Sequence, residues 1–307
     1  MADSILSAPR FIDDNAAREH LEALRWPNGA VCPHCGGTER NSKLKAKTEN
    51  GARPGLYFCG DCRSQFSVTV GTVFERSKIA LHKWILATHL ICASKKGMSS
   101  KQLERMLGVT YKTAWFMTHR IREAMKPNGG GLLGSGGKPV EVDETYWGTD
   151  PTRKNKAPGG GSTHKMKIVT LVERGGDARS FHVPRVNGKN LKPIMREHIA
   201  KEAHLMTDES RVYSGVGKEF ASHSSVNHKI GEYARGQVTT NTVEGYFSLL
   251  KRGLIGTFHH VGEQHLQRYV TEFDFRWNTR KMNDGERTEL AIQNAHGKRL
   301  TGLQYRA

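Results

Sequence analysis

Three carboxylates and one lysine have the types and the spacing that phosphoryl chemistry requires. Asp208 and Glu244 are separated by 35 residues, and Asp143 ends an earlier strand-like run at 139–143. Lys251 follows Glu244 after about two helical turns. Carboxylates that meet in space can hold two cations, which clamp the attacking and leaving oxygens of a phosphodiester. The series therefore predicts metal-dependent chemistry on a nucleic-acid backbone.

The elements around these residues are consistent with a single site. Asp143 follows alternating apolar residues, and Asp208 ends a second strand-like run at 204–208, so both could lie in one sheet. Glu244 stands on a helical pattern and Lys251 lies on nearly the same side of it. The adjacent face of this helix carries an apolar stripe made of Val243, Phe247, Leu250 and Leu254.

Each acid also has a purely structural interpretation. Asn241 and Glu244 have the spacing of a helix capping box, Asp143 could simply end a strand, and Asp208 could cap the segment that follows. Three neighbouring acids receive no role from the pattern: Glu141, Glu144 and Glu209. The last two would point to the opposite pleat face from Asp143 and Asp208 if the strands continue.

Two Cys-x-x-Cys pairs, 23 residues apart, predict a structural zinc site. Four thiolates from two tight turns satisfy tetrahedral zinc and leave no position for water, so this zinc would serve folding and binding. A redox dithiol or a disulfide would not explain two such pairs. The four expected ligands are Cys32, Cys35, Cys59 and Cys62, whereas Cys92 fits an ordinary core thiol in an apolar helix.

The stretch from 99 to 123 predicts two helices around Gly108 and Val109, capped by Ser99 and Thr110. Such a pair can place its second helix in the major groove of DNA. A plain helical hairpin with solvated basic residues is the alternative. The expected DNA-contacting residues are Tyr111, Lys112, Thr113, Trp115, His119 and Arg120 on this helix, together with Arg252 beside Lys251.

The composition favours a polyanionic partner. The 307 residues carry a formal net charge of +17 with a pI near 9.8, and the excess is spread over both halves of the chain. Nucleic acid is therefore the expected partner, although a merely soluble basic protein is the alternative. No apolar run has the length of a membrane span, and the N-terminus lacks a signal-peptide pattern. We expect a cytoplasmic, nucleoid-associated protein without a membrane partner.

Changes of pattern along the chain predict five parts. Strand-like runs after the linker, with helical patterns between and after them, predict an α/β fold with a mixed sheet covered by helices. A second Gly-rich piece lies at 158–162. The parts are an N-terminal helix with zinc ribbon (1–75), a helix-turn-helix region (76–128), a Gly-rich linker (129–138), a catalytic domain (139–285) and a C-terminal tail (286–307).

The chain resembles the DDE transposases of bacterial insertion sequences, specifically the ISXO-like group with an N-terminal zinc ribbon, over about residues 15–285. The resemblance is carried by CPHCG at 32–36, VEVDETYWG at 140–148, TDE at 207–209, NTVEGYFSLLKRG at 241–253 and QRYVTEFDFRWNTR at 267–280. It implies an RNase H-like core with two Mg²⁺ or Mn²⁺ ions. It places the catalytic residues at Asp143, Asp208 and Glu244, assisted by Lys251. Some members carry Asn where others have the third acid, so Asn241 is a second candidate there.

The expected function is that of an insertion-sequence transposase. The ribbon and the helix pair would bind the terminal inverted repeats, and the core would free a 3′-hydroxyl that then attacks target DNA. A homo-oligomer is expected in the synaptic complex. Two alternatives remain: a zinc-ribbon, helix-turn-helix transcription regulator without catalysis, and an RNase H-like nuclease that only hydrolyses DNA.

Overall fold

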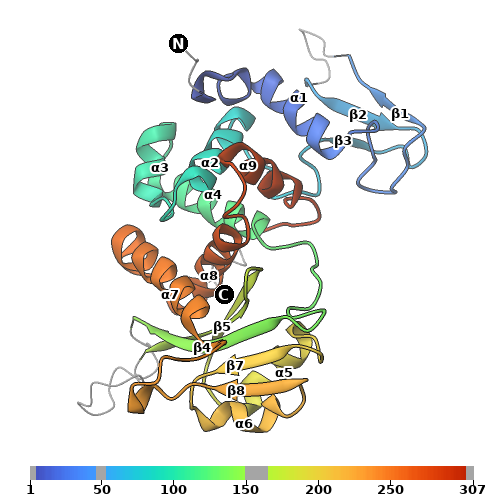
Figure 1. Cartoon of the computed structure of the whole chain (residues 1–307). Helices are drawn as coiled ribbons and strands as arrows, with labels where there is room; N and C mark the ends of the chain where they lie inside the picture. Colours follow the sequence, from blue (N-terminus) through green and yellow to red (C-terminus); the bar gives the residue numbers. More distant parts are fainter. Residues whose placement is uncertain (1–4, 46–52, 149–164, 302–307) are drawn as a thin grey trace. The chain divides into compact units, whose positions relative to one another are not determined.

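The computed structural model describes residues 5–45, 53–148 and 165–301, so the Gly-rich piece at 158–162 lies outside the described residues (Figure 1). The chain divides into two compact units. The first, called here the N-terminal unit, combines residues 1–126 with 282–307. The second, called the sheet unit, is formed by 127–281. Among the described residues, no helix has both the length and the apolar character that a membrane span requires.

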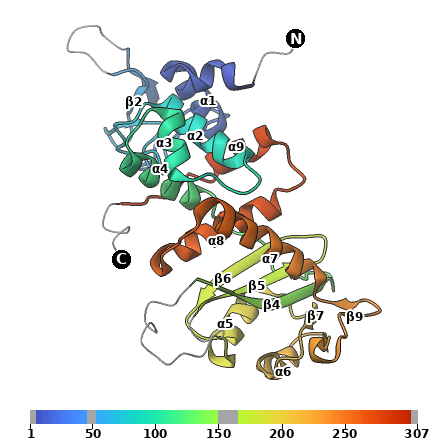
Figure 2. The same ribbon diagram turned by 90° about the vertical axis from the view of Figure 1, so that its left-hand side faces the viewer.

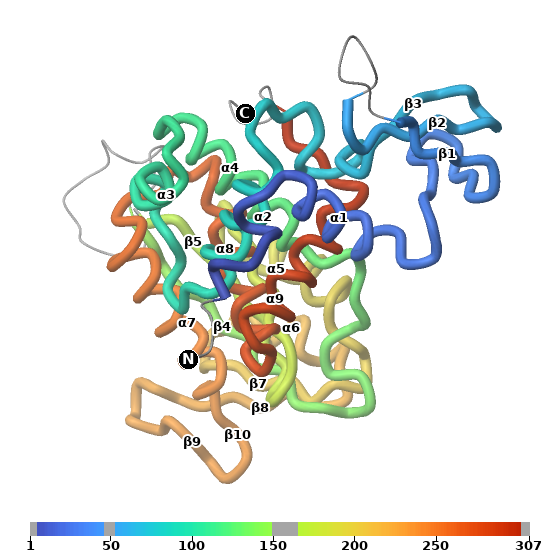
Figure 3. Tube along the Cα trace, turned by 90° about the horizontal axis from the view of Figure 1, so that it is seen from above, coloured from blue at the N-terminus to red at the C-terminus, as the bar shows by residue number. Residues whose placement is uncertain are grey.

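The N-terminal unit begins with helix α1 (Asp14–Arg25) and a three-stranded antiparallel sheet. Asp13 caps α1 by accepting the N–H of Ala16 at 2.8 Å. The strands are β1 (Asn41–Lys43), β2 (Leu56–Cys59) and β3 (Gln65–Ser67), in that order, and Figure 3 shows them grouped together. Trp26 packs edge-on against Tyr57 and Phe66, so aromatic rings supply the core of this small sheet.

Three helices follow in the same unit: α2 (Leu81–Ala93), α3 (Ser100–Leu107) and α4 (Tyr111–Ala124). Both expected caps form, because Ser99 accepts the N–H of Gln102 and Thr110 accepts that of Thr113. Between α3 and α4, Gly108 has φ 61°, a left-handed conformation that glycine adopts without steric cost.

The C-terminal segment is not a tail. Residues 284–293 form helix α9 (Asp284–Gln293), which opens with a capping box between Asn283 and Glu286. It belongs to the N-terminal unit, where Arg287 donates to the carbonyl of Cys92 at 2.8 Å and His89 lies 3.1 Å from Thr288. A partly apolar helix gains more by covering α2 than by remaining in water, which explains the difference from the sequence-based boundary.

Among the described residues of the sheet unit, the main sheet has five strands in the order β6-β5-β4-β7-β8. They are β4 (Pro139–Trp147), β5 (Met166–Glu173), β6 (Ala178–Val183), β7 (His204–Thr207) and β8 (Ser222–Ser225). Strands β4, β5 and β6 pair antiparallel, whereas β7 runs parallel to both β4 and β8. The expected mixed sheet is therefore present (Figure 2).

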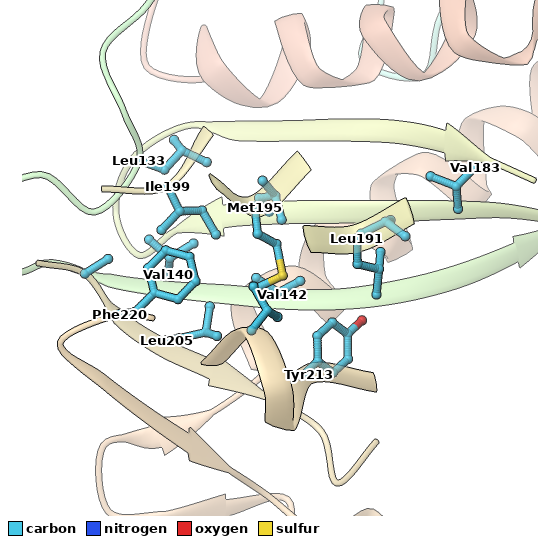
Figure 4. Close-up of a cluster of buried hydrophobic side chains, with 14 residues drawn as sticks. Leu133, Val140, Val142, Val183, Leu191, Met195, Ile199, Leu205, Tyr213 and Phe220 are labelled. Carbon is cyan, nitrogen blue, oxygen red and sulfur yellow. The ribbon is translucent and has the colours of Figure 1, made fainter. Parts of the chain in front are cut away.

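Helices cover both faces of this sheet (Figures 1 and 2). Helices α5 (Gly188–His198) and α6 (Arg211–Gly217) pack on one face, over the buried cluster that includes Val140 and Val142 (Figure 4). Helices α7 (Asn241–Gly253) and α8 (Glu263–Asn278) pack on the other, over a second cluster. Because neighbouring side chains of a strand alternate, Glu141 and Asp143 face α7.

A short hairpin precedes α7. Strands β9 (Ala234–Arg235) and β10 (Val238–Thr239) pair antiparallel and project beside the ends of β7 and β8 (Figure 3). The remaining described elements are short: η1 (Ile5–Ser7), η2 (Pro9–Phe11), η5 (His228–Ile230) and the π-helical turn η6 (Leu254–Phe258).

Candidate active site

The four residues singled out for phosphoryl chemistry line one cavity of about 410 Å³ in the sheet unit. The last parallel pair between β4 and β7 joins Val142 to Thr207. Asp143 and Asp208 therefore both lie one residue beyond it, at the point where β7 ends. The lining consists of Asp143, Glu144, Thr145, Asp208, His228, Glu244, Phe247, Ser248 and Lys251.

Asp143 lies in an environment that disfavours its charge. It is partly buried in β4, and its Oδ1 accepts the N–H of Glu144 at 2.7 Å. Burial, reinforced by three neighbouring carboxylates, raises the pKa of Asp143 to about 8. Those carboxylates belong to Glu144, Asp208 and Glu244. A cation in the cavity would relieve this repulsion, since opposite charge favours the ionised carboxylate.

Asp208 has a local role as well as a place in the cavity. Its Oδ1 accepts the N–H of Ser210 at 3.0 Å, in the turn that leads to α6. This bond resembles the capping role that the sequence left open. The residue nevertheless lines the cavity, so its carboxylate is available at the same edge of the sheet as Asp143.

Glu244 is on the first turn of α7 and its Oε1 accepts the hydroxyl of Thr240 at 3.1 Å. The capping-box interpretation is wrong, because α7 begins at Asn241 itself and its N-cap residue, Thr240, makes no side-chain cap bond. Asn241 is exposed and does not belong to the cavity lining, whereas Glu244 does.

Lys251 supplies the positive group of the cavity. Both Lys251 and Arg252 are exposed on α7, but Lys251 is the one that lines the cavity. The apolar stripe of α7 packs on the sheet through Val243 and Leu250, which leaves Glu244 and Lys251 on the open side. The arrangement is an acidic pocket with one lysine at its wall.

Among the lining residues that received no role from the sequence, two are titratable: Glu144 and His228. Glu144 does face the other side of the pleat, as expected, and its carboxylate accepts the hydroxyl of Tyr213 in α6 at 2.5 Å. It still reaches the cavity because β7 has ended beside it. His228 lies 3.9 Å from Glu244, between Nε2 and Oε1. No sequence pattern pointed to His228, since η5 lacks a periodic signal.

The cysteine cluster of the N-terminal unit has the geometry of a zinc site. The Sγ atoms of Cys32 and Cys62 lie 3.7 Å apart, and those of Cys35 and Cys59 lie 3.6 Å apart. All four sulfurs lie within 4.8 Å of one another. Tetrahedral zinc with Zn–S bonds of about 2.3 Å places its sulfurs about 3.8 Å apart, so the four residues fit the ion. This supports the predicted structural zinc.

The expected DNA-contacting face of α4 is exposed only in its first turns. Tyr111 and Lys112 are exposed, and Thr113 and Trp115 are half-buried. His119 and Arg120 are 0% and 4% exposed, so the prediction that the helix presents them to DNA was wrong. Arg120 instead donates to the carbonyls of Glu75 and Leu300, at 2.9 and 3.3 Å.

Comparison with known families agrees with these features. A transposase zinc-ribbon domain matches residues 12–65, and an ISXO2-like transposase domain matches residues 132–278. The chain belongs to the ISXO2-like transposase family. The resemblance carried by the sequence motifs is thereby confirmed, and together the two matches span more than half of the chain.

The chain is also similar to two relatives and to one solved structure. The chain is 28% identical over 286 residues to an uncharacterized protein in transposable element ISH50 of Halobacterium salinarum. This alignment covers 87% of this chain and 91% of that protein. It is 27% identical over 114 residues to a transposase-like protein of Haemophilus influenzae, covering 37% and 83%. A Mos1 transposase paired-end complex with the left transposon end aligns over 70% of this chain and 80% of that one, at 10% identity and TM-score 0.20. Membership of the family rests on the domain matches.

Proposed function

We propose that this insertion-sequence transposase binds the terminal inverted repeats of its element and catalyses metal-dependent DNA strand cleavage and strand transfer. The observation that carries the proposal is the cavity in which Asp143, Asp208, Glu244 and Lys251 meet. They come from strand β4, from the residue directly after β7 and from helix α7, and the same set was predicted from the spacing and the strand and helix patterns of the sequence.

We further propose that the sheet unit is an RNase H-like core. Three antiparallel strands followed by two parallel ones, in the order β6-β5-β4-β7-β8, support this assignment, as do the helices on both faces. The first catalytic acid then lies on the central strand β4 and the second directly after its parallel neighbour β7.

The proposed catalytic ions are Mg²⁺ or Mn²⁺, held by Asp143, Asp208 and Glu244. The donor set fits, because hard divalent cations prefer carboxylate oxygens. Unlike the four sulfurs, the carboxylates are not gathered within 4.8 Å of one another among the described residues. When bound, the ions would activate the attacking oxygen and stabilise the charge on the phosphate.

The other residues of the cavity have defined tasks in this proposal. Lys251, at the wall, contacts a phosphate oxygen and offsets negative charge on the substrate. His228 keeps Glu244 in place through their 3.9 Å contact and through the hydroxyl of Thr240, 3.3 Å from its Nε2. We assign the third acid to Glu244 and not Asn241, because Glu244 lines the cavity.

DNA binding is proposed for the N-terminal unit. The helix pair α3–α4 and the left-handed glycine between them support a helix-turn-helix, in which the first turns of α4 would meet the bases. The proposed contacts are Tyr111, Lys112, Thr113 and Trp115, with Arg252 binding backbone phosphate near the cavity. Pairing of two element ends would require at least two copies of the chain, and work on chromosomal DNA would place it at the nucleoid.

The test is a strand-transfer assay with a labelled element end, target DNA and Mg²⁺ or Mn²⁺. The proposal predicts a joined product in addition to the cleaved end. Cleavage without joining would indicate a nuclease that only hydrolyses. Tight binding of a promoter without cleavage, with either metal, would favour a transcription regulator.

A further inference from the structure

We propose that Glu141 and Arg174 are positioning residues that set the place of Glu244 relative to Asp143. They hold the N-terminus of α7 against the central strand. The inference rests on the proposed function, in which Glu244 and Asp143 act on the same ions.

Glu141 is a buried carboxylate that caps a helix from a distant strand. Its side chain is 0% exposed. It accepts the N–H groups of Thr242 and Val243, at 2.7 and 3.0 Å, and the hydroxyl of Thr242 at 2.8 Å. The first turn of a helix leaves such N–H groups unpaired, and its positive end attracts negative charge. Since Thr240 makes no side-chain cap bond, Glu141 satisfies α7 in its place.

Arg174, at the turn after β5, holds this carboxylate in place. Its Nε and Nη2 donate to Glu141 Oε1 at 3.1 and 2.8 Å. The same guanidinium donates to the carbonyls of Gln237 and Thr239, at 2.9 and 3.3 Å, in the segment that leads into α7. These six residues form one hydrogen-bonded network around the buried Glu141 carboxylate, which joins β4, the turn after β5, the β9–β10 hairpin and the helix. Removing one partner of such a pair leaves an uncompensated charge.

The network links the strand that carries Asp143 to the helix end that carries Glu244. Glu141 lies two residues before Asp143 on the same face of β4. Its partners Thr242 and Val243 directly precede Glu244. A shift of the helix end would therefore move Glu244 but leave Asp143 in the sheet. Misplacement of a catalytic group by about 1 Å can cost about 100-fold in rate.

The experiment compares wild-type protein with Glu141→Gln in single-turnover cleavage of a labelled element end. In the variant, the glutamine NH₂ replaces a carboxylate oxygen and would face N–H donors from either Arg174 or α7. Because an NH₂ group cannot accept a hydrogen bond, the substitution breaks the network while the size of the side chain stays nearly the same. We expect the rate constant to fall by about tenfold or more, and the Mg²⁺ concentration for half-maximal rate to rise. Affinity for the end and the cleaved fraction at completion should stay at wild-type values.

These readouts separate positioning from stability alone. A merely structural role would lower the cleaved fraction in proportion to the unfolded protein and leave the rate constant unchanged, and that result would overturn the inference. Thr242→Val provides a milder second variant, because it removes one hydroxyl bond to Glu141 and keeps the backbone bonds. It should lower the same rate constant by a smaller factor, and a wild-type value in a folded Thr242→Val protein would also overturn the inference.

A matched control is Glu219→Gln, which breaks an exposed Glu–Arg pair with Arg196 in the same unit, at 2.6 Å. It should cleave like wild type. If the wild-type protein cleaves and Glu141→Gln matches it, positioning fails and the proposed function stands. If the wild-type protein does not cleave with Mg²⁺ or Mn²⁺, the proposed function fails and the positioning inference falls with it.

Discussion

Asp143 and Asp208 each stand one residue beyond the register pair Val142–Thr207, which is the last parallel pair between β4 and β7. The backbone pairing of the sheet therefore brings Asp143 of β4 and Asp208, the first residue after β7, to the same end of the two strands. This relationship gives the proposed active site a rigid base, on which α7 adds Glu244 and Lys251.

Removal of one zinc ligand should release the metal. Cys59→Ser breaks the four-sulfur set, whose members lie within 4.8 Å of one another, and a structural zinc contributes on the order of 10 kcal/mol to folding. We expect zinc content to fall from about one ion per chain to near zero. Cys92→Ser is the control, since this buried cysteine of α2 lies outside the cluster, and loss of zinc there would contradict the assignment.

Two basic residues of α4 should behave differently when replaced by alanine. Lys112 is exposed, so Lys112→Ala should weaken binding of the element end without a change in melting temperature. The slope of the logarithm of the binding constant against the logarithm of the salt concentration should become smaller in magnitude by about one. Arg120 is buried and bonded to two carbonyls, so Arg120→Ala should reduce the free energy of unfolding by about 2 kcal/mol or more. Equal effects of the two variants on stability would contradict the burial of Arg120.

The stability of the protein should depend on pH through Asp274. Burial raises its pKa from 3.8 to about 6, although bonds from Ser180 and Tyr246 oppose the shift. Between about pH 4 and 6 the folded state binds more protons than the unfolded chain, so the free energy of unfolding should decrease as pH rises through this interval. Asp274→Asn should remove that part of the slope in denaturant titrations, and an unchanged slope would rule out Asp274 as its source.

Neighbouring cations of α7 should have separable effects on the reaction. Lys251 lines the cavity, so Lys251→Ala should slow cleavage of bound DNA by about 10- to 100-fold. Arg252 does not belong to the cavity lining, so Arg252→Ala should weaken DNA binding and leave the rate of the bound complex near wild type. The reverse pattern in single-turnover kinetics would show that Arg252, and not Lys251, serves the chemistry.

Local patterns predicted those parts of the fold that local physics controls. Ser99 and Thr110 cap their helices as expected because a cap involves residues three positions apart. Alternation before Asp143 predicted a strand, and paired cysteines predicted the metal cluster. The family resemblance added the expectation that the zinc ribbon precedes a catalytic core that contains the three acids.

What the sequence could not predict depends on partners that are far apart along the chain. Glu141 received no role because its partners Arg174 and Thr242 are distant in sequence, although a carboxylate between apolar strand residues was a signal of such a network. His119 and Arg120 were predicted to lie on an exposed basic helix, but both are buried, and Arg120 donates to the carbonyl of Leu300, 180 residues further along the chain. Burial by a distant segment leaves no trace in helical periodicity.

The most direct test of the acidic site is Mg²⁺-dependent cleavage of a labelled element end by wild type, Asp143→Asn and Asp208→Asn. Both substitutions keep the size of the side chain and replace a carboxylate that would hold a cation with a neutral amide. We predict that each variant binds end DNA like wild type and cleaves at least about 1,000-fold more slowly, because the transition-state charge loses its metal-held stabilisation. Cleavage at the wild-type rate by either variant would contradict the proposed mechanism.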